Sequence, residues 1–430
     1  MSHEHHQPVA WDEARRRLCA AASAIVGQVR KTPEPGDVLA ADVPAPMDVP
    51  HYTSSAMDGF AVRGDGPWRL LAAPFTGSQG RNVHRSGGTL ADGEALPVLT
   101  GSLLPDGADS VIRSENAEVT GEELRAEHPA PGRDIRPSGQ EWHVGDTLLT
   151  APRRLSPRHA AMLGAAGVDE VTVARAPKVA CAFTGNEVVA SGVPGPGEVR
   201  DAFSVSFPAL LTGWGAEVVA AEHLADDPVA VEDWLRRPSV LDADIVVMTG
   251  GSGRSGQDFA RRFITRAALA SGAGGEILAD EVACQPGHPT LLVRRIISGR
   301  PQLIAGVPGN PFAAHVALHS FVQPAVATAL GVDAPVLSGV LGAAVEPIRR
   351  DRVRLMPAVF GGAESGAGGA GAAGVGAAAS TRTPADPESA LTVLPGRLSH
   401  MLSGYAAADA LVIVPREGLA AGDGVRYLPL

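Results

Sequence analysis

The spacing of apolar residues predicts two helices and a series of short strands in the N-terminal part of the chain. Residues 11–26 and 157–166 carry apolar side chains at helical spacing. Between them, residues 40–50 read as an extended connector broken by prolines, and residues 54–63 as a polar turn rich in small residues. Short β-like runs separated by Gly and Asp turns then fill residues 68–127, at positions 97–100, 110–113 and 123–126. We therefore predict a small β domain here.

The pattern changes after Pro177, where short apolar strands alternate with helical segments. The strands fall at residues 178–183, 216–221, 244–248 and 302–306. This alternation predicts a parallel sheet with helices on both faces, a doubly wound α/β domain. In such sheets ligands bind beyond the carboxyl ends of the strands. We therefore expect the candidate site in four loops, at residues 184–187, 226–227, 249–258 and 307–311.

The C-terminal part returns to a β pattern. Apolar runs at residues 353–360, 391–394, 410–414 and 425–428 predict a terminal β domain. Residues 361–380, almost entirely Gly and Ala, interrupt it and predict a flexible loop without chemistry. The predicted fold class is multidomain α/β plus β. Its domains are residues 1–50 with 140–176, residues 51–139, residues 177–333 and residues 334–430.

Composition narrows the class of protein. A chain of 430 residues should hold about two to four domains. Its 36 basic and 47 acidic side chains leave a net charge of −11 without a basic cluster, which argues against nucleic-acid binding. The cysteines Cys19, Cys181 and Cys284 lack paired spacing, so we expect neither disulfides nor a zinc site. No apolar run is long enough for a signal peptide or a membrane-spanning helix, so we expect a soluble protein of the cytoplasm that does not associate with a membrane.

A string of residues in the N-terminal half is the most specific motif of the chain. Residues 48–63 read DVPHYTSSAMDGFAVR, and this segment resembles the signature of the molybdopterin molybdenumtransferase family, which is MoeA-like and related to the E domain of gephyrin. Further matches follow in the family's order at Thr100-Gly101, Gly107-Ala108-Asp109, Glu115, residues 133–139, Thr184-Gly185, Glu187, Asp226-Asp227-Pro228, Thr249-Gly250-Gly251, Pro286-Gly287, residues 306–311, residues 399–403 and residues 408–415. The resemblance covers nearly the whole chain.

The resemblance implies a fold and an activity. The fold has an elongated N-terminal domain, a small β domain, a MogA-like molybdopterin-binding α/β domain and a C-terminal β-barrel-like domain. The activity is insertion of molybdate into adenylated molybdopterin with release of AMP, dependent on Mg²⁺. The resemblance also implies a homodimer, in which the α/β domain of one subunit faces the signature region of the other, and a molybdopterin adenylyltransferase as a partner.

The reaction joins two anions, so its site needs positive charge or a magnesium ion together with aligned donors. Glu187, Asp227 and Asp258 lie on loops after strands, and carboxylates suit a hard cation. Glu187 and Asp258 are the predicted metal ligands. For all three carboxylates, helix capping or turn closure is the alternative. Similarly, Asp58 either faces the cleft, as the resemblance implies, or closes a local Asx turn.

The remaining site residues follow from loop chemistry and from the resemblance. The amides of Gly250 and Gly251 precede a predicted helix and can hold an oxyanion. The pair His315 and His319 has ligand-like spacing, although a packed pair without a metal is favoured because no third ligand is in view. The predicted catalytic residues are Asp58, Thr100, Asp227 and Asp258, and the predicted substrate-binding residues are Arg136, Thr184, Gly185, Gly250, Gly251, Arg254, His288, Pro308, Pro311 and Ser399.

The chain departs from the family pattern near the predicted anion site. Gln285 and His288 stand where the family has lysines around Pro286-Gly287, and Ala202-Phe203 replace a hydroxyl residue and Asn. Two hypotheses follow. Arg254, Arg136 and His288 rebuild the anion site, since arginine binds oxyanions bidentately; or the chain is a paralogue that binds the pterin as a carrier or scaffold. A third hypothesis, a generic nucleotide-binding α/β protein, leaves the signature string unexplained.

Overall fold

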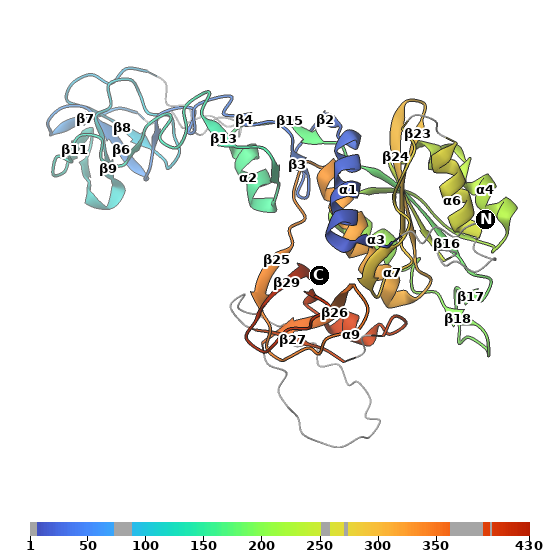
Figure 1. Cartoon of the computed structure of the whole chain (residues 1–430). Helices are drawn as coiled ribbons and strands as arrows, with labels where there is room; N and C mark the ends of the chain where they lie inside the picture. Colours follow the sequence, from blue (N-terminus) through green and yellow to red (C-terminus); the bar gives the residue numbers. More distant parts are fainter. Residues whose placement is uncertain (1–6, 73–87, 251–258, 271–273, 362–389, 396–397) are drawn as a thin grey trace. The chain divides into compact units, whose positions relative to one another are not determined.

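The computed structural model describes residues 7–72, 88–250, 259–270, 274–361, 390–395 and 398–430. The predictions for Gly251, Arg254 and Asp258, and for the Gly- and Ala-rich insert from residue 362 onward, lie outside these residues. The chain forms two compact units, one of residues 1–29 with 174–430 and one of residues 30–173 (Figure 1). In the described part of the chain, no helix combines the length and apolar character needed to cross a membrane.

A six-stranded sheet forms the centre of the first unit. Four strands, β19 (Glu217–Leu224), β16 (Lys178–Thr184), β20 (Ile245–Thr249) and β24 (Arg300–Val307), are parallel, as predicted. The sheet then continues with two antiparallel strands, β23 (Leu291–Ile297) and β21 (Glu276–Ala279), which the sequence pattern did not predict. The all-parallel prediction is therefore wrong at this edge. Ser298 and Gly299 both have positive φ and form a tight hairpin, which leaves no room for a crossover helix.

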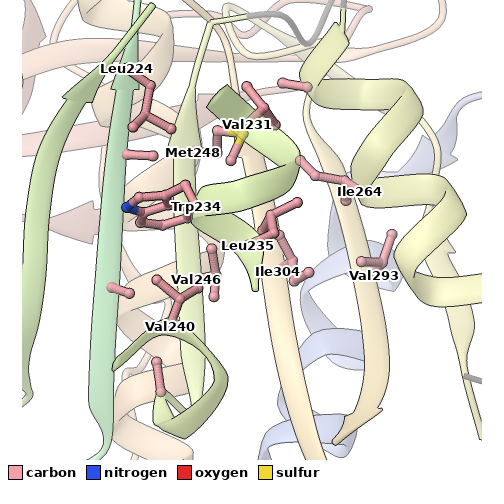
Figure 2. Close-up of a cluster of buried hydrophobic side chains, with 14 of the residues drawn as sticks. Leu224, Val231, Trp234, Leu235, Val240, Val246, Met248, Ile264, Val293 and Ile304 are labelled. Carbon is pink, nitrogen blue, oxygen red and sulfur yellow. The ribbon is translucent and has the colours of Figure 1, made fainter. Parts of the chain in front are cut away.

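Helices cover both faces of this sheet, which confirms the doubly wound fold (Figure 1). On one face α4 (Pro228–Leu235), α5 (Pro238–Asp242) and α6 (Phe259–Leu269) bury Trp234 and Ile264 against Val246, Met248 and Ile304 (Figure 2). The alternate residues Ile245, Val247 and Leu303 are also almost fully buried, as strands covered on both faces require.

The other face is covered by helices from distant parts of the chain. These are α1 (Trp11–Ala22) with its 3₁₀ extension (Ser23–Ile25), α3 (Phe207–Trp214), and the helical run α7 (Pro311–Ala317), the π-helix Leu318–Val322 and α8 (Gln323–Ala329). The helix α1 packs on α8 and on the π-helix, with the rings of Trp11 and Phe321 6.5 Å apart. The finer division into four domains stays a prediction.

The C-terminal part forms a second sheet in the same unit, in the order β1-β22-β26-β28-β29-β25, with β27 paired to β26. Strands β26 (Val353–Phe360) and β28 (Ala410–Val414) match the predicted bounds, and β27 (Leu391–Val393), β29 (Gly424–Pro429) and β25 (Leu337–Val340) complete this region. The other two strands, β1 (Val9–Ala10) and β22 (Val282–Gln285), come from outside it. Because β22 pairs with β26, the loop that follows β22 lies against the C-terminal sheet.

The second unit holds the small β sheet that the pattern predicted. Its order is β10-β11-β7-β8-β6-β9, with β6 at Gly59–Val62, β7 at Trp68–Leu70, β8 at Glu94–Val98, β9 at Ser110–Arg113, β10 at Glu118–Thr120 and β11 at Glu123–Arg125. Residues 54–63 are therefore not one polar turn. Ala61 and Val62 are completely buried, so β6 pairs with β8 and β9, and β5 (Ser54–Ser55) pairs with β12 (Ile135–Arg136).

The rest of the second unit is an extended layer around the helix α2 (Pro157–Ala165). Leu39, Leu163 and Val173 form the centre of its own hydrophobic core. The strands are β2 (Gln28–Lys31), β3 (Val38–Leu39), β4 (Val43–Pro44), β13 (Thr147–Leu149), β14 (Arg153–Arg154) and β15 (Val171–Ala174).

Candidate functional site

A cavity of about 600 Å³ opens at the carboxyl ends of the parallel strands of the first unit. We call it the first cavity. The strands β16, β20 and β24 end at Thr184, Thr249 and Val307, so the loops that follow them meet at one edge of the sheet. The predicted site residues that line it are Thr184, Gly185, Glu187, Gly250 and Pro311. The topology of the sheet therefore brings together five positions that lie far apart in the sequence.

The backbone at the floor of the first cavity is tightly fitted. The Thr184 hydroxyl donates to the carbonyl oxygen of Thr249 at 2.7 Å, which ties β16 to β20. Gly250 follows directly with φ of 75°, and a Cβ there would lie 2.3 Å from Oγ1 of Thr184. Only glycine meets both requirements. The glycine predicted to approach a ligand closely thus also has a structural reason to be glycine.

Carboxylates dominate the charge of the first cavity. Glu187, Asp201 and Asp226 line it, and Arg200 is the one arginine or lysine among its described lining residues. The loops of Asn186 and Asp226 hold each other, because each backbone amide donates to the other's side chain at 3.1 Å. The cavity is therefore suited to a cation or to a ligand that arrives with one.

Asp227, next to Asp226 in the sequence, caps a helix and does not face the cavity. Asp227 accepts a bond from the amide of Ala230 at 2.9 Å and caps α4, the alternative considered for it from the sequence, and it does not line the cavity. No group of three or more His, Cys, Asp or Glu side chains within the described ranges is arranged to hold a metal ion. Since Asp258 lies outside those ranges, the predicted pair Glu187 and Asp258 stays a prediction.

A flap forms one side of the first cavity. It consists of β17 (Val188–Val189) and β18 (Val199–Arg200), which pair in parallel, and it leads into residues 201–203. The Asp201 carboxylate accepts bonds from Ser204 and from the amide of Phe203 and lies 3.0 Å from Nε2 of His223. Burial acts to raise the pKa of Asp201, but these hydrogen bonds and His223 outweigh it, so the pKa is lowered. Asp201 therefore keeps its charge and fixes the start of this wall.

A second cavity of about 360 Å³ adjoins the first, since Asn310 and His400 line both. Predicted residues His288, Pro308 and Ser399 line it. The pairing of β22 with β26 explains this meeting, because it sets the loop of His288 beside the C-terminal sheet. The carbonyl oxygen of Ser399 accepts from the amide of Ala313 at 3.1 Å, which joins the C-terminal part to α7.

The second cavity carries no carboxylate among its described lining residues, and Arg352, His288 and His400 line it. Nε of Arg352 is buried and has no hydrogen-bond partner in the described part of the chain. Cys284 also lines this cavity, but burial raises its pKa to about 12, so it remains a neutral thiol. This cavity is suited to an anion.

The remaining predicted residues lie in the second unit. Oδ1 of Asp58 accepts from the amide and the hydroxyl of Thr100 at 2.6 and 2.9 Å, and these two bonds lower the pKa of Asp58. These partners are distant in sequence, so the carboxylate does not close a local Asx turn on its own amides. Gly59 is required beside it, because a Cβ there would lie 2.0 Å from the carbonyl oxygen of Ile112. Arg136 is exposed on β12, opposite Ser54.

Among the acidic, arginine and histidine residues that line the cavities, Arg200, Asp201, Arg352 and His400 were not predicted as site residues, and Asp226 was predicted only as part of a candidate loop. A signal existed for Asp226 and His400, since both stand inside motifs that resemble the family. Arg200 and Arg352 carried no such signal. Arg352 belongs to a run of basic residues, and only the folded chain shows which of them lines a cavity. Asn310 occupies the N-cap position of α7 but makes no side-chain capping bond, so its amide is available to a ligand.

Comparisons with known proteins agree with this architecture. Residues 9–167 match the family described as "MoeA N-terminal region (domain I and II)", and residues 180–328 match the family described as "Probable molybdopterin binding domain". The fold and its two cavities thus define a protein of the MoeA class, built around an α/β molybdopterin-binding domain.

Individual relatives give the family. The chain is 30% identical to Molybdopterin molybdenumtransferase 2 of Mycobacterium tuberculosis over 309 residues, which cover 70% of this chain and 74% of that protein. It is 30% identical to Molybdopterin molybdenumtransferase of Nostoc sp. over 297 residues, 68% of this chain and 66% of that protein. The crystal structure of the molybdopterin biosynthesis MoeA protein from Pyrococcus horikoshii superposes with a TM-score of 0.73 at 25% identity, covering 98% of this chain and 99% of that one. The chain therefore belongs to the molybdopterin molybdenumtransferase family, enzymes of molybdenum cofactor biosynthesis.

Proposed function

We propose that this chain transfers molybdenum from molybdate to the dithiolene of adenylated molybdopterin and releases AMP. The observation that carries the proposal is the pair of adjoining cavities with opposite charge, which share Asn310 and His400. The reaction has two anionic substrates, one of them a nucleotide that arrives with a divalent cation. Two cavities of this kind give each substrate its own site while the reacting groups meet at the shared wall.

In this proposal the first cavity binds the adenylated pterin. Gly185 and Gly250 let a ligand approach the backbone, and the Thr184 side chain lies beside them. Arg200 on the flap supplies a guanidinium for a phosphate oxygen. The predicted roles of Thr184, Gly185, Gly250 and Pro311 in substrate binding are kept here, and Arg200 is added to them.

Magnesium fits the same cavity. Glu187 and Asp226 offer the oxygen ligands that a hard divalent cation prefers. We propose Glu187 and Asp258 as the protein ligands. When bound, the ion would neutralise charge on the phosphoanhydride and favour departure of AMP. Asp227, which caps α4, would then act only by fixing the loop that presents Asp226.

The second cavity binds molybdate in this proposal. Arg352, His288 and Ser399 offer a guanidinium, an imidazole and a hydroxyl, in place of the lysines that the family carries around Pro286-Gly287. The Arg352 guanidinium lines this cavity, and a guanidinium binds an oxyanion through charge-assisted hydrogen bonds. The predicted contributions of Arg254 and Arg136 to the anion site stay proposals.

Further parts of the proposal concern assembly. Asp58 and Thr100 act in catalysis, the enzyme is a homodimer, a molybdopterin adenylyltransferase hands over its product, and the reaction takes place in the cytoplasm. The Asp58–Thr100 pair supports the first of these, because its hydrogen bonds keep a charged carboxylate in one orientation. Light scattering of the purified protein tests the dimer, with a mass of twice 44.0 kDa as the expected result.

The test of the activity is AMP release from adenylated molybdopterin by the purified protein, with and without molybdate and Mg²⁺, followed by reconstitution of a cofactor-free molybdoenzyme. Release that needs both ions, together with active cofactor, supports the transferase. Tight pterin binding without AMP release would instead support the carrier or scaffold hypothesis.

A further inference from the structure

Behind the first cavity lies a buried cluster of aromatic and histidine side chains that the proposed reaction does not use. Its members are Phe203, Phe207, His315, His319 and Tyr405, which come from the flap wall, α3, the helical run from Pro311, and α9 (Ser403–Ala407). His315 and His319 are 2% and 3% exposed, so both are packed histidines as favoured from the sequence. We call this group the histidine cluster.

His315 contacts one wall of the first cavity directly and reaches a second wall through Ser206. Its Nδ1 lies 2.8 Å from the carbonyl oxygen of Pro311, and its Nε2 lies 3.0 Å from Oγ of Ser206. Ser206 in turn lies 2.7 Å from the carbonyl oxygen of Ala202. Pro311 and Ala202 both line the cavity, on opposite loops of the chain. Through Ser206, the imidazole therefore connects the first turn of α7 to the segment after β18.

The direction of these bonds follows from the acceptors. A carbonyl oxygen can only accept, so Nδ1 carries the proton of the neutral ring and Nε2 is an acceptor. Burial lowers the pKa of His315, against a smaller opposing effect of the Pro311 carbonyl, which favours this neutral form. The single proton of Ser206 is shared between Nε2 of His315 and the carbonyl oxygen of Ala202, as a three-centre bond or donated to one of them at a time, so Ser206 is the point at which His315 meets the segment after β18. No apolar residue at position 315 can reproduce this link.

Tyr405 contacts both histidines of the cluster. Its ring lies 4.8 Å from that of His315, and its hydroxyl lies 2.9 Å from Nε2 of His319. Tyr405 stands five residues after His400, which lines both cavities. The ring of Phe203, 6.2 Å from His315, completes the contact between the cluster and the cavity wall.

We propose that His315 is a positioning residue, which holds the Ala202 and Pro311 walls of the first cavity at a set separation. The proposal rests on the proposed function only for the identity of the ligand. In physical terms, the buried hydrogen bonds of the His315 imidazole with Pro311 and Ser206 set the shape of the ligand-free cavity.

Hydrogen–deuterium exchange of the ligand-free protein tests this link without any assumption about function. His315→Leu keeps a buried apolar side chain but removes both bonds, so exchange should rise in residues 199–206 and 309–314 together. Ser206→Ala removes only one arm and should raise exchange in residues 199–206 alone. His319→Gln is the matched control. It changes an equally buried histidine on the same helical run that has no bond to the Ala202 or Pro311 walls, and both segments should stay as in the wild type.

Binding of AMP, used as the probe, gives the functional readout. We expect His315→Leu to weaken AMP binding about tenfold, because removal of one or two hydrogen bonds leaves the cavity less preorganised for its ligand. The same variant should raise the KM for adenylated molybdopterin more than it lowers kcat. His315→Gln, which retains a donor and an acceptor, should recover part of the affinity.

The outcomes separate the two proposals. Unchanged exchange in both segments for His315→Leu, or equal increases for His319→Gln, would overturn the positioning role whether or not the enzyme turns over. If the wild-type protein failed to release AMP from adenylated molybdopterin, the proposed function would fail, while the exchange result would still decide the role of His315. Should His315→Leu not fold, Ser206→Ala carries the exchange test for residues 199–206, and unchanged exchange there would overturn the positioning role.

Discussion

The two cavities lie side by side and share Asn310 and His400, yet their walls carry opposite charge. The first is lined by Glu187, Asp201 and Asp226 with one arginine, and the second by Arg352 and two histidines without a described carboxylate. The first is built from loops after parallel strands, whereas the second needs β22 from the α/β part to pair with the C-terminal sheet. The proposed nucleotide site therefore depends mainly on the α/β fold, whereas the proposed anion site also depends on the C-terminal sheet.

The largest effect is expected from the acidic side of the comparison. Glu187→Gln removes a charge proposed to hold Mg²⁺, and loss of several kcal/mol of charge stabilisation lowers kcat by about 10²- to 10³-fold. The measurement is initial AMP release at saturating Mg²⁺. Glu198→Gln is the control, because Glu198 stands one residue before β18, as Glu187 stands one residue before β17, but does not line the cavity. Its kcat should remain within about twofold of the wild type. Equal losses in both variants would remove Glu187 from the metal site.

The shared wall gives the next prediction, because α9 is tied to the helical run by Tyr405 and His319. Burial lowers the pKa of His319 to about 4, whereas an unfolded histidine titrates near pH 6.5. Between these pH values the unfolded chain binds one more proton than the folded chain, so stability falls as the pH is lowered from about 6.5 to about 4. The expected loss is about 3 kcal/mol from this group.

Urea unfolding across this pH range measures the effect. His319→Gln should flatten the dependence, while replacement of the exposed His51 by Gln should leave the wild-type slope. A slope that His319→Gln does not change would mean that His319 is not held neutral by burial.

The basic side of the comparison is tested by Arg352→Met. Loss of a charge-assisted bond of about 1.5 to 2.5 kcal/mol raises the KM for molybdate roughly ten- to sixtyfold and leaves AMP affinity unchanged. Arg350→Met, on the same basic run but outside the cavity lining, controls for the change in net charge. If Arg352→Met weakened AMP and molybdate equally, the two cavities would not bind separate ligands.

The smallest effect concerns the second unit, where the Asp58 carboxylate accepts two hydrogen bonds from Thr100. Thr100→Val removes the hydroxyl bond but keeps the amide bond, so the pKa of Asp58 should rise while staying below its ordinary value. Carbon-detected NMR titration of the carboxyl group measures this shift. Thr120→Val, at an exposed position of β10, should leave it unchanged; an identical rise there would show a general rather than a local effect.

Much of the fold was predictable because it depends on local periodicity. The strands β9, β26 and β28 have the predicted bounds, since each is a predominantly apolar run, interrupted only by Ser110, Arg113 and Arg354. The antiparallel strands β23 and β21 were missed, although Ser298-Gly299 between two apolar runs is a hairpin signal. Residues 54–63 were predicted as a turn because most of their side chains are small or polar. The strand β6 within them is buried only through its pairing with β8 and β9.

The site was predictable where residues stand in motifs and unpredictable where packing decides. Thr184, Gly185, Glu187, Gly250 and Pro311 meet in one cavity because their loops follow parallel strands. In contrast, whether Asp226 or Asp227 faces that cavity depends on which carboxylate caps α4. Arg352 lines the second cavity only because two distant β segments pair. Such long-range contacts leave no local pattern in the sequence.

The most direct test of two separate ligand sites is equilibrium binding of labelled molybdate to the protein saturated with AMP. The account predicts that molybdate binds while AMP stays bound, and that Arg352→Met loses molybdate but keeps AMP. Competition between molybdate and AMP for one site, or molybdate binding that Arg352→Met leaves intact, would contradict it.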